Sequence, residues 1–277
     1  MYRSLSLGVL TALASVFSGS AAFAASFNND YSSLPVYGEA TINGITAKVT
    51  RGINPGDTAG TQGAFSEFYG KNTVTIDFNS PATQVGENKY TFGNDKVTYT
   101  FEKGMSTRSG KTGVYNNVWA PAGANGERNK SDYLAVFKGN SVTIDLAEEL
   151  NYFGIDWGAL SPNNDFAFYK DGVQVSEFTY NDVNPIAPVR AAHQRNEGNG
   201  YIHFFAEDAA ATFNQIVISQ SGGGGFETDN HSFRFGNDGF DFENPDEPSE
   251  DVPEPTALVG LIAIGGLLVR RNMFSAS

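Results

Sequence analysis

Short runs of β-branched and aromatic residues, each closed by a turn-forming residue, constrain the fold of this chain most. They recur about every 8 to 14 residues and are bounded by Gly, Asn, Asp or Pro, the pattern of many short strands. The run Thr73–Phe78, with the sequence TVTIDF, alternates cleanly between the two faces of a strand. About a dozen such strands with few helix formers predict an all-β fold. Because the edges of such a sheet need protection, we expect a jelly-roll-like antiparallel β-sandwich over residues 25–235.

Turn signals between neighbouring strands predict hairpins. We expect hairpins at four turns: Asn43-Gly44, Gly93-Asn94-Asp95, Lys138-Gly139-Asn140 and Asp171-Gly172. Leu146–Leu150, with the sequence LAEEL, is the one patch of helix formers, and it predicts a single helical turn before Tyr152.

The beginning of the chain has the features of a secretory signal peptide over residues 1–24. Arg3 provides a positive charge, Leu5–Phe17 is apolar, and small residues precede a cleavage site between Ala24 and Ala25. A core helix at this position is the alternative. The prediction implies that the rest of the chain is exported.

The end of the chain predicts a temporary membrane anchor within residues 252–277. Thr256–Val269 is apolar and uncharged, and Arg270 and Arg271 follow it directly. Fourteen helical residues span roughly 21 Å, which is short for a hydrocarbon core of about 30 Å, so a buried core helix is the rival interpretation. Paired arginines can extend the span and would stay on the cytoplasmic side. We therefore expect a short transmembrane helix over residues 256–269.

The motif Val252, Pro253, Glu254, Pro255, followed by the apolar run and the two arginines, resembles the PEP-CTERM sorting signal of bacterial surface proteins. The resemblance implies export by the Sec machinery, cleavage by an exosortase near the motif, and delivery to the cell surface or the extracellular matrix. Proline on both sides of Glu254 keeps the motif extended, as a protease substrate requires. Tails of this family also carry a name that refers to ice-binding proteins, and nothing in these residues supports ice binding.

A second resemblance concerns residues 131–235. An aromatic and glycine-containing strand at Asn151–Gly158, a strand-turn-strand unit around Asp171-Gly172 and the late motif Phe226–Asn230 are similar to the β-sandwich found in many PEP-CTERM surface proteins. The similarity implies a fold and carries little information about function. The long segment Asn181–Asn199 and the additional N-terminal strands depart from simpler versions of that sandwich.

Charge and cysteine content limit the function classes. Residues 25–255 contain 15 Lys and Arg against 31 Asp and Glu, a net charge of −16, which repels nucleic-acid phosphates. The chain contains no cysteine, so no disulfide stabilises it. Residues 236–251 are acidic and rich in proline, and they predict an extended stalk between the body and the sorting signal.

Candidate binding residues lie in a loop and on strands. Thr107–Lys130 reads as a long Gly- and Asn-rich loop, and Trp119 within it is a candidate platform for a sugar ring. Trp157 is a second candidate, although its alternating strand favours a core position. Glu227, Asp229 and Asn230 are candidate ligands of a structural Ca²⁺, since that ion takes six to eight oxygens; the alternative is that they bond to backbone in a turn.

No catalytic residue is predicted. Gly-x-Ser-x-Gly, P-loop and His-Glu-x-x-His motifs are absent, and His193, His203 and His231 lie far apart without any cysteine, so a zinc site is not expected. The sequence therefore favours a non-catalytic surface protein that binds or organises extracellular polysaccharide. The alternatives are a purely structural matrix or adhesion component, and a secreted glycan-active enzyme, which would need paired carboxylates in a cleft.

Overall fold

The computed structural model describes residues 36–55, 61–183, 189–190 and 198–245. This part is built almost entirely from antiparallel strands, with one helical turn, α1 (Tyr180–Val183), and a short 3₁₀ turn at Ala209–Ala211. The prediction of an all-β fold is therefore confirmed. The signal peptide, Ala24 and Ala25, and the sorting signal with Arg270 and Arg271 lie outside the described residues. Within those residues, no helix has the length and apolar character needed to span a membrane.

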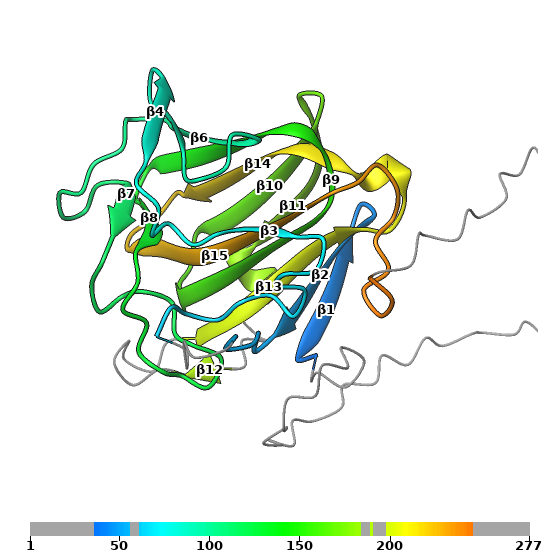
Figure 1. The fold of residues 1–277 in the computed structure, drawn as a ribbon, viewed down its shortest axis with the longest axis horizontal. Helices are drawn as coiled ribbons and strands as arrows, with labels where there is room; N and C mark the ends of the chain where they lie inside the picture. Colours follow the sequence, from blue (N-terminus) through cyan, green and yellow to red (C-terminus); the bar gives the residue numbers. More distant parts are fainter. Residues whose placement is uncertain (1–35, 56–60, 184–188, 191–197, 246–277) are drawn as a thin grey trace, which may run out of the picture.

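Fifteen strands form one hydrogen-bonded network (Figure 1). The first eight are β1 (Gly38–Ile42), β2 (Ile45–Thr50), β3 (Val74–Ile76), β4 (Thr83–Gly86), β5 (Lys89–Thr91), β6 (Val97–Phe101), β7 (Gly113–Tyr115) and β8 (Tyr133–Phe137). The others are β9 (Asn140–Leu160), β10 (Asn164–Lys170), β11 (Val173–Thr179), β12 (Val189–Arg190), β13 (Gly198–Ala206), β14 (Phe213–Gln220) and β15 (Gly225–Phe235).

Strand β9 organises the sheet because its two halves have different neighbours. Its first half lies between β6 and β14, where Ile144 is opposite both Tyr99 and Ile216. Its second half lies between β13 and β15. Beyond β14 follow β10 and β11, and beyond β13 follow β2 and β1. The single strand thus joins two groups of strands, which we call the β14 half and the β13 half.

Aromatic side chains from the two halves meet in one core. Phe204 of β13 packs against Phe166 and Phe168 of β10 and Phe178 of β11, with ring centroids about 5 Å apart. Phe153 of β9 stacks on Phe204 at 6.2 Å. Burying each such side chain contributes about 1.5–3 kcal/mol relative to exposing it, so this cluster explains how the chain folds without disulfides.

Two of the predicted hairpins show why short turn motifs are reliable signals. The turn between β1 and β2 has positive φ at Asn43 (51°) and Gly44 (81°), and the turn between β10 and β11 has positive φ at Asp171 (51°) and Gly172 (79°). Asn, Asp and Gly tolerate this conformation, which matches the twist of a hairpin. Strands β5 and β6 also pair as predicted.

Two local predictions are wrong. Lys138-Gly139-Asn140 does not close a hairpin, because β8 pairs with β7 and β15 while the beginning of β9 pairs with β6 and β14. Leu146–Leu150 is not a helical turn and belongs to β9. There Leu146 pairs with Val97 and Leu150 with Phe213, so pairing with neighbouring strands overrides the helix propensity of the segment.

The prediction that an extended stalk begins at Gly236 is wrong for residues 236–245. Phe240 and Phe242 are buried, at 5% and 4% exposed, against Phe68, Tyr152 and Phe205. The backbone nitrogen of Phe240 donates to the carbonyl of Ala206 at 2.9 Å. Two phenylalanines spaced two apart anchor this acidic segment on the body, and residues 246–251 lie outside the described residues.

Candidate functional site

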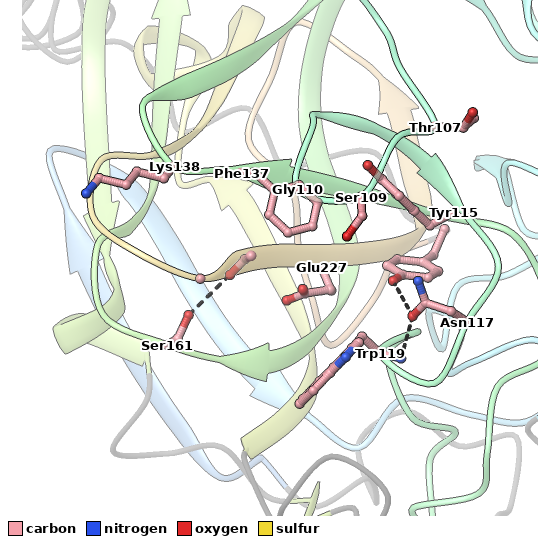
Figure 2. Close-up of a pocket in the computed structure, with 13 residues that line it drawn as sticks. Thr107, Ser109, Gly110, Tyr115, Asn117, Trp119, Phe137, Lys138, Ser161 and Glu227 are labelled. Atoms are coloured by element: carbon pink, nitrogen blue, oxygen red, sulfur yellow. Dashed lines mark hydrogen bonds between the residues drawn. The ribbon is translucent and has the colours of Figure 1, made fainter.

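A cleft of about 780 Å³ opens beside β7, β8 and the beginning of β15 (Figure 2). Its lining comes from the loop before β7, the two strands, the residues after Tyr115 and the turn before β15. The lining residues are Thr107, Ser109, Gly110, Tyr115, Asn117, Trp119, Tyr133, Phe137, Lys138, Ser161, Gly224, Gly225 and Glu227. Six of the thirteen come from the predicted loop Thr107–Lys130, so the sequence identified the main segment of this site.

Aromatic rings form one wall of the cleft. Tyr115 and Tyr133 face each other across the β7–β8 pair with ring centroids 6.2 Å apart, and Tyr115 meets the edge of Phe137 at 5.7 Å. Trp119 is half-buried and packs against the same group of side chains. The cleft therefore presents flat apolar surface beside polar groups, as ligand pockets commonly do.

Asn117 fixes the position of two of these aromatic residues. Its side-chain oxygen accepts a hydrogen bond from the Tyr133 hydroxyl at 2.9 Å and from the Trp119 backbone nitrogen at 2.9 Å. The Tyr115 hydroxyl donates to the carbonyl oxygens of Arg108, at 2.6 Å, and Lys111. The loop before β7 is thus held by hydrogen bonds to the aromatic wall.

Glu227 places a carboxylate in the cleft. The side chain is 6% exposed, and Figure 2 shows its carboxylate between Trp119 and Phe137. A Cβ atom at Gly225 would collide with this carboxylate, so glycine at 225 makes room for it. Burial, and then the charge of Glu227, raise the pKa of the Tyr133 hydroxyl, which therefore stays protonated as a hydrogen-bond donor.

The structure places the two tryptophans that were predicted as platforms in different environments. Trp119 lines the cleft, whereas Trp157 is 0% exposed in the core and packs against Phe166 and Phe226. Trp157 offers no surface to a ligand, because its β9 position faces the other half of the sheet. The sequence did not reveal the roles of Tyr115, which lies within the predicted Thr107–Lys130 loop, and of Tyr133, which follows it.

The predicted calcium ligands do not surround one point. Glu227 faces the cleft, while Asp229 is 0% exposed and accepts hydrogen bonds from Asn129 Nδ2 at 2.8 Å and Ser131 Oγ at 3.2 Å. The Asn230 amide nitrogen donates to the backbone carbonyls of Gln62 and Ala64. Across the described ranges, no three acidic, histidine or cysteine side chains converge as a metal-ligand set.

A pair of buried carboxyl groups lies on β9 and β15, outside the residues that line the cleft. Asp156 of β9 is directly opposite Asp229 of β15, and both are fully buried. Asp156 Oδ2 accepts a hydrogen bond from the Ala64 backbone nitrogen at 2.7 Å, and its Oδ1 has no hydrogen-bond partner. Burial raises the pKa of both carboxyls, and the charge of Asp229 raises that of Asp156 further. Burial and the neighbouring charge therefore both favour the protonated form of Asp156.

Two histidines are buried in hydrogen-bonded positions. His203 lies 2.9 Å from Glu67 and 2.8 Å from the Tyr152 hydroxyl. His231 contacts the Tyr99 hydroxyl and Thr228, and burial lowers its pKa to about 3, so it is neutral near pH 7. His193, in the predicted Asn181–Asn199 loop, lies outside the described residues.

Comparisons of the chain with protein-family models, with curated proteins and with solved structures find no match.

Proposed function

We propose that this chain is an exported, exosortase-sorted surface protein whose jelly-roll-like β-sandwich body binds or organises extracellular polysaccharide without catalysis. The aromatic cleft is the observation that carries the proposal, because it combines ring surfaces with hydrogen-bonding groups. The flat faces of sugar rings pack on aromatic side chains, and their hydroxyls bond to carboxylate and amide oxygens. Trp119 and Glu227 supply these two kinds of contact.

The distribution of carboxylates favours binding over hydrolysis. Glycoside hydrolases use two carboxyl groups roughly 5–10 Å apart on either side of the scissile bond. Glu227 is the one acidic residue among those described as lining the cleft. Asp229, on the same face of β15, is fully buried and bonded to Asn129 and Ser131.

Replacing the ring that is best placed for stacking tests the binding proposal. Trp119→Ala is expected to abolish measurable glycan-array binding of the full chain, because loss of one aromatic contact costs about 1–3 kcal/mol even in stacking sites of other kinds. Tyr69→Ala is the matched control, since Tyr69 is an aromatic residue with 45% exposure that does not line the cleft. Repeating the array with EDTA reports whether a divalent cation contributes.

Three outcomes distinguish the function classes. Binding that needs Trp119 and leaves the glycan intact supports the proposal. Absence of binding to every glycan would favour a purely structural matrix or adhesion component. Cleavage of a polysaccharide that is lost in Glu227→Gln would establish an enzyme instead.

Export and sorting have a separate test. The signal-peptide features and the resemblance to the PEP-CTERM signal support delivery to the cell surface or medium after transient membrane anchoring. We expect the intact mass of the mature protein recovered there to correspond to a chain that begins at Ala25 and ends within residues 252–256. Recovery of the uncut chain from the cell interior would contradict this part of the proposal.

A further inference from the structure

The stretch that supplies most of the cleft lining carries more basic than acidic residues, and Glu227 of β15 adds one negative charge to the lining. From Thr107 to Lys138, the first and last lining residues of this stretch, the chain has five basic and two acidic residues, a net charge of +3 in a chain of net charge −13. The five basic residues, which we call the basic rim, are Arg108, Lys111, Arg128, Lys130 and Lys138.

The two acidic residues of this stretch accept hydrogen bonds from neutral groups. Glu127 accepts hydrogen bonds from the Asn54 side chain at 2.9 Å and from the Asn125 backbone nitrogen at 2.8 Å. Asp132 accepts one from the Asn116 side chain at 2.9 Å. All five residues of the basic rim are exposed, and none forms an ion pair with another residue of the described ranges. Their charges are therefore available to a ligand.

One member of the basic rim lines the cleft, and two others are next to lining residues in the chain. Lys138 lines it, while Arg108 and Lys111 flank the lining residues Ser109 and Gly110 in the chain. The Tyr115 hydroxyl bonds to the carbonyls of both Arg108 and Lys111, which fixes the backbone that carries these two charges. The positive charge is thus held in place at the edge of the aromatic wall.

We infer that the ligand of this cleft is an acidic polysaccharide, one whose sugars carry carboxylate or sulfate groups. The inference rests on the proposed function and names its substrate class. The acidic groups would lie along the basic rim, and the sugar hydroxyls would donate to Glu227. Exposed positive charge near the cleft of a chain with net charge −13 would attract a polyanion to this part of the molecule.

A matched pair of polymers tests the assignment. Polygalacturonate carries a carboxylate on every sugar, and its fully methyl-esterified form keeps the same backbone without the charge. We expect the full chain to bind polygalacturonate at least about tenfold more tightly in titration calorimetry. The preference should disappear between about 0.1 M and about 1 M salt, as the Debye length falls from roughly 10 Å to roughly 3 Å.

Single-charge variants locate the effect. Lys138→Ala is expected to weaken polygalacturonate binding roughly two- to fivefold, the range for one exposed ion pair, and to weaken binding of the ester by a smaller factor. Lys89→Ala is the control, because Lys89 is an exposed lysine of β5 that does not line the cleft. The triple variant Arg108→Ala, Lys111→Ala, Lys138→Ala should remove the preference for the charged polymer.

Each remaining outcome has a distinct meaning. Equal binding of both polymers, with Trp119 still required, would overturn the acidic-ligand assignment and leave the proposed function standing. No binding of either polymer or of any arrayed glycan would overturn both. Binding of single-stranded DNA as tight as that of polygalacturonate would also overturn the assignment, in favour of an unselective polyanion surface.

Discussion

The two buried aspartates have the same chemistry and different surroundings. Asp229 accepts three hydrogen bonds, from the Asn129 side chain, the Ser131 hydroxyl and the Asn230 backbone nitrogen. Asp156 accepts one, from the Ala64 backbone nitrogen, and its second oxygen has no partner. Because hydrogen bonds stabilise the charged form, Asp229 is better suited to stay ionised and Asp156 to be protonated.

This asymmetry predicts opposite effects of two isosteric substitutions. A carboxyl with a raised pKa in the folded state holds a proton that the unfolded chain releases. Its contribution therefore lowers the free energy of unfolding as the pH rises above about 4. Asp156→Asn removes this penalty, so its stability relative to the parent should increase between pH 5 and pH 8. Asp229→Asn turns an NH₂ group toward the Asn230 backbone nitrogen, which is itself a donor. This substitution should lower the free energy of unfolding by about 1–3 kcal/mol at both pH 5 and pH 8.

Urea unfolding of the two variants and the parent at pH 5 and pH 8 measures both effects. The two substitutions change the same atoms on directly opposed residues, so each serves as the control for the other. Equal destabilisation by both variants at both pH values would show that Asp156 is not the protonated member of the pair.

The contents of the cleft could be predicted from the sequence only in part. Trp119 was predicted as a ligand platform because it lies in a polar loop. Trp157 was a second candidate, although its position on an alternating strand favoured the core. Glu227 was noticed as a metal ligand and not as a cleft residue. Its role depends on β15 pairing with β8, which lies about 90 residues earlier in the chain, and no local pattern reports such a pairing.

At the scale of elements, local turn chemistry was predictable and strand partnership was not. Asn43-Gly44 and Asp171-Gly172 specify their hairpins through positive φ, a property of the residues themselves. Lys138-Gly139-Asn140 looks similar, but the strands it connects pair elsewhere. Likewise, Leu146–Leu150 has helical propensity in isolation. It forms part of the long strand β9 because strands on both sides of β9 pair with it.

The packing of segment 236–245 on the body could not be predicted from its composition. Its acidic residues predicted a solvated stalk, yet Phe240 and Phe242 cover a face of the β13 half that includes Tyr152 and Phe205. Lys48 lies over the Phe242 ring at 4.6 Å and also contacts Glu243 at 3.4 Å. Two apolar anchors are enough to fix a segment whose other residues favour water.

Removing one anchor should therefore destabilise the body. Phe242→Ala is expected to lower the free energy of unfolding by about 3–5 kcal/mol, the usual cost of truncating a buried phenylalanine. Glu243→Ala, next to it, removes only an exposed partner of Lys48 and should cost less than about 1 kcal/mol. Urea unfolding measures both. A loss below about 1 kcal/mol for Phe242→Ala would mean that the segment does not stabilise the body in solution.

At the scale of the whole molecule, the all-β class and the excess of negative charge were predictable, because each depends on the composition of many residues and not on which of them meet. The grouping of strands around β9 was not, since it depends on which distant strands meet. The same holds for the cleft, whose lining combines residues of the Thr107–Lys138 stretch with Ser161, Gly224, Gly225 and Glu227 from distant parts of the chain.

The order in which the strands pair also determines when this body can fold. Strand β2 lies beside β13, with Val49 opposite Ile202, and β3 lies beside β15, with Ile76 opposite His231, so the earliest strands find their neighbours some 150 residues later. Such distant pairings make folding slow and delay it until the last strand has been synthesised. A nascent chain of this kind remains open for threading through a narrow channel, which suits a protein that we propose leaves the cell before it folds.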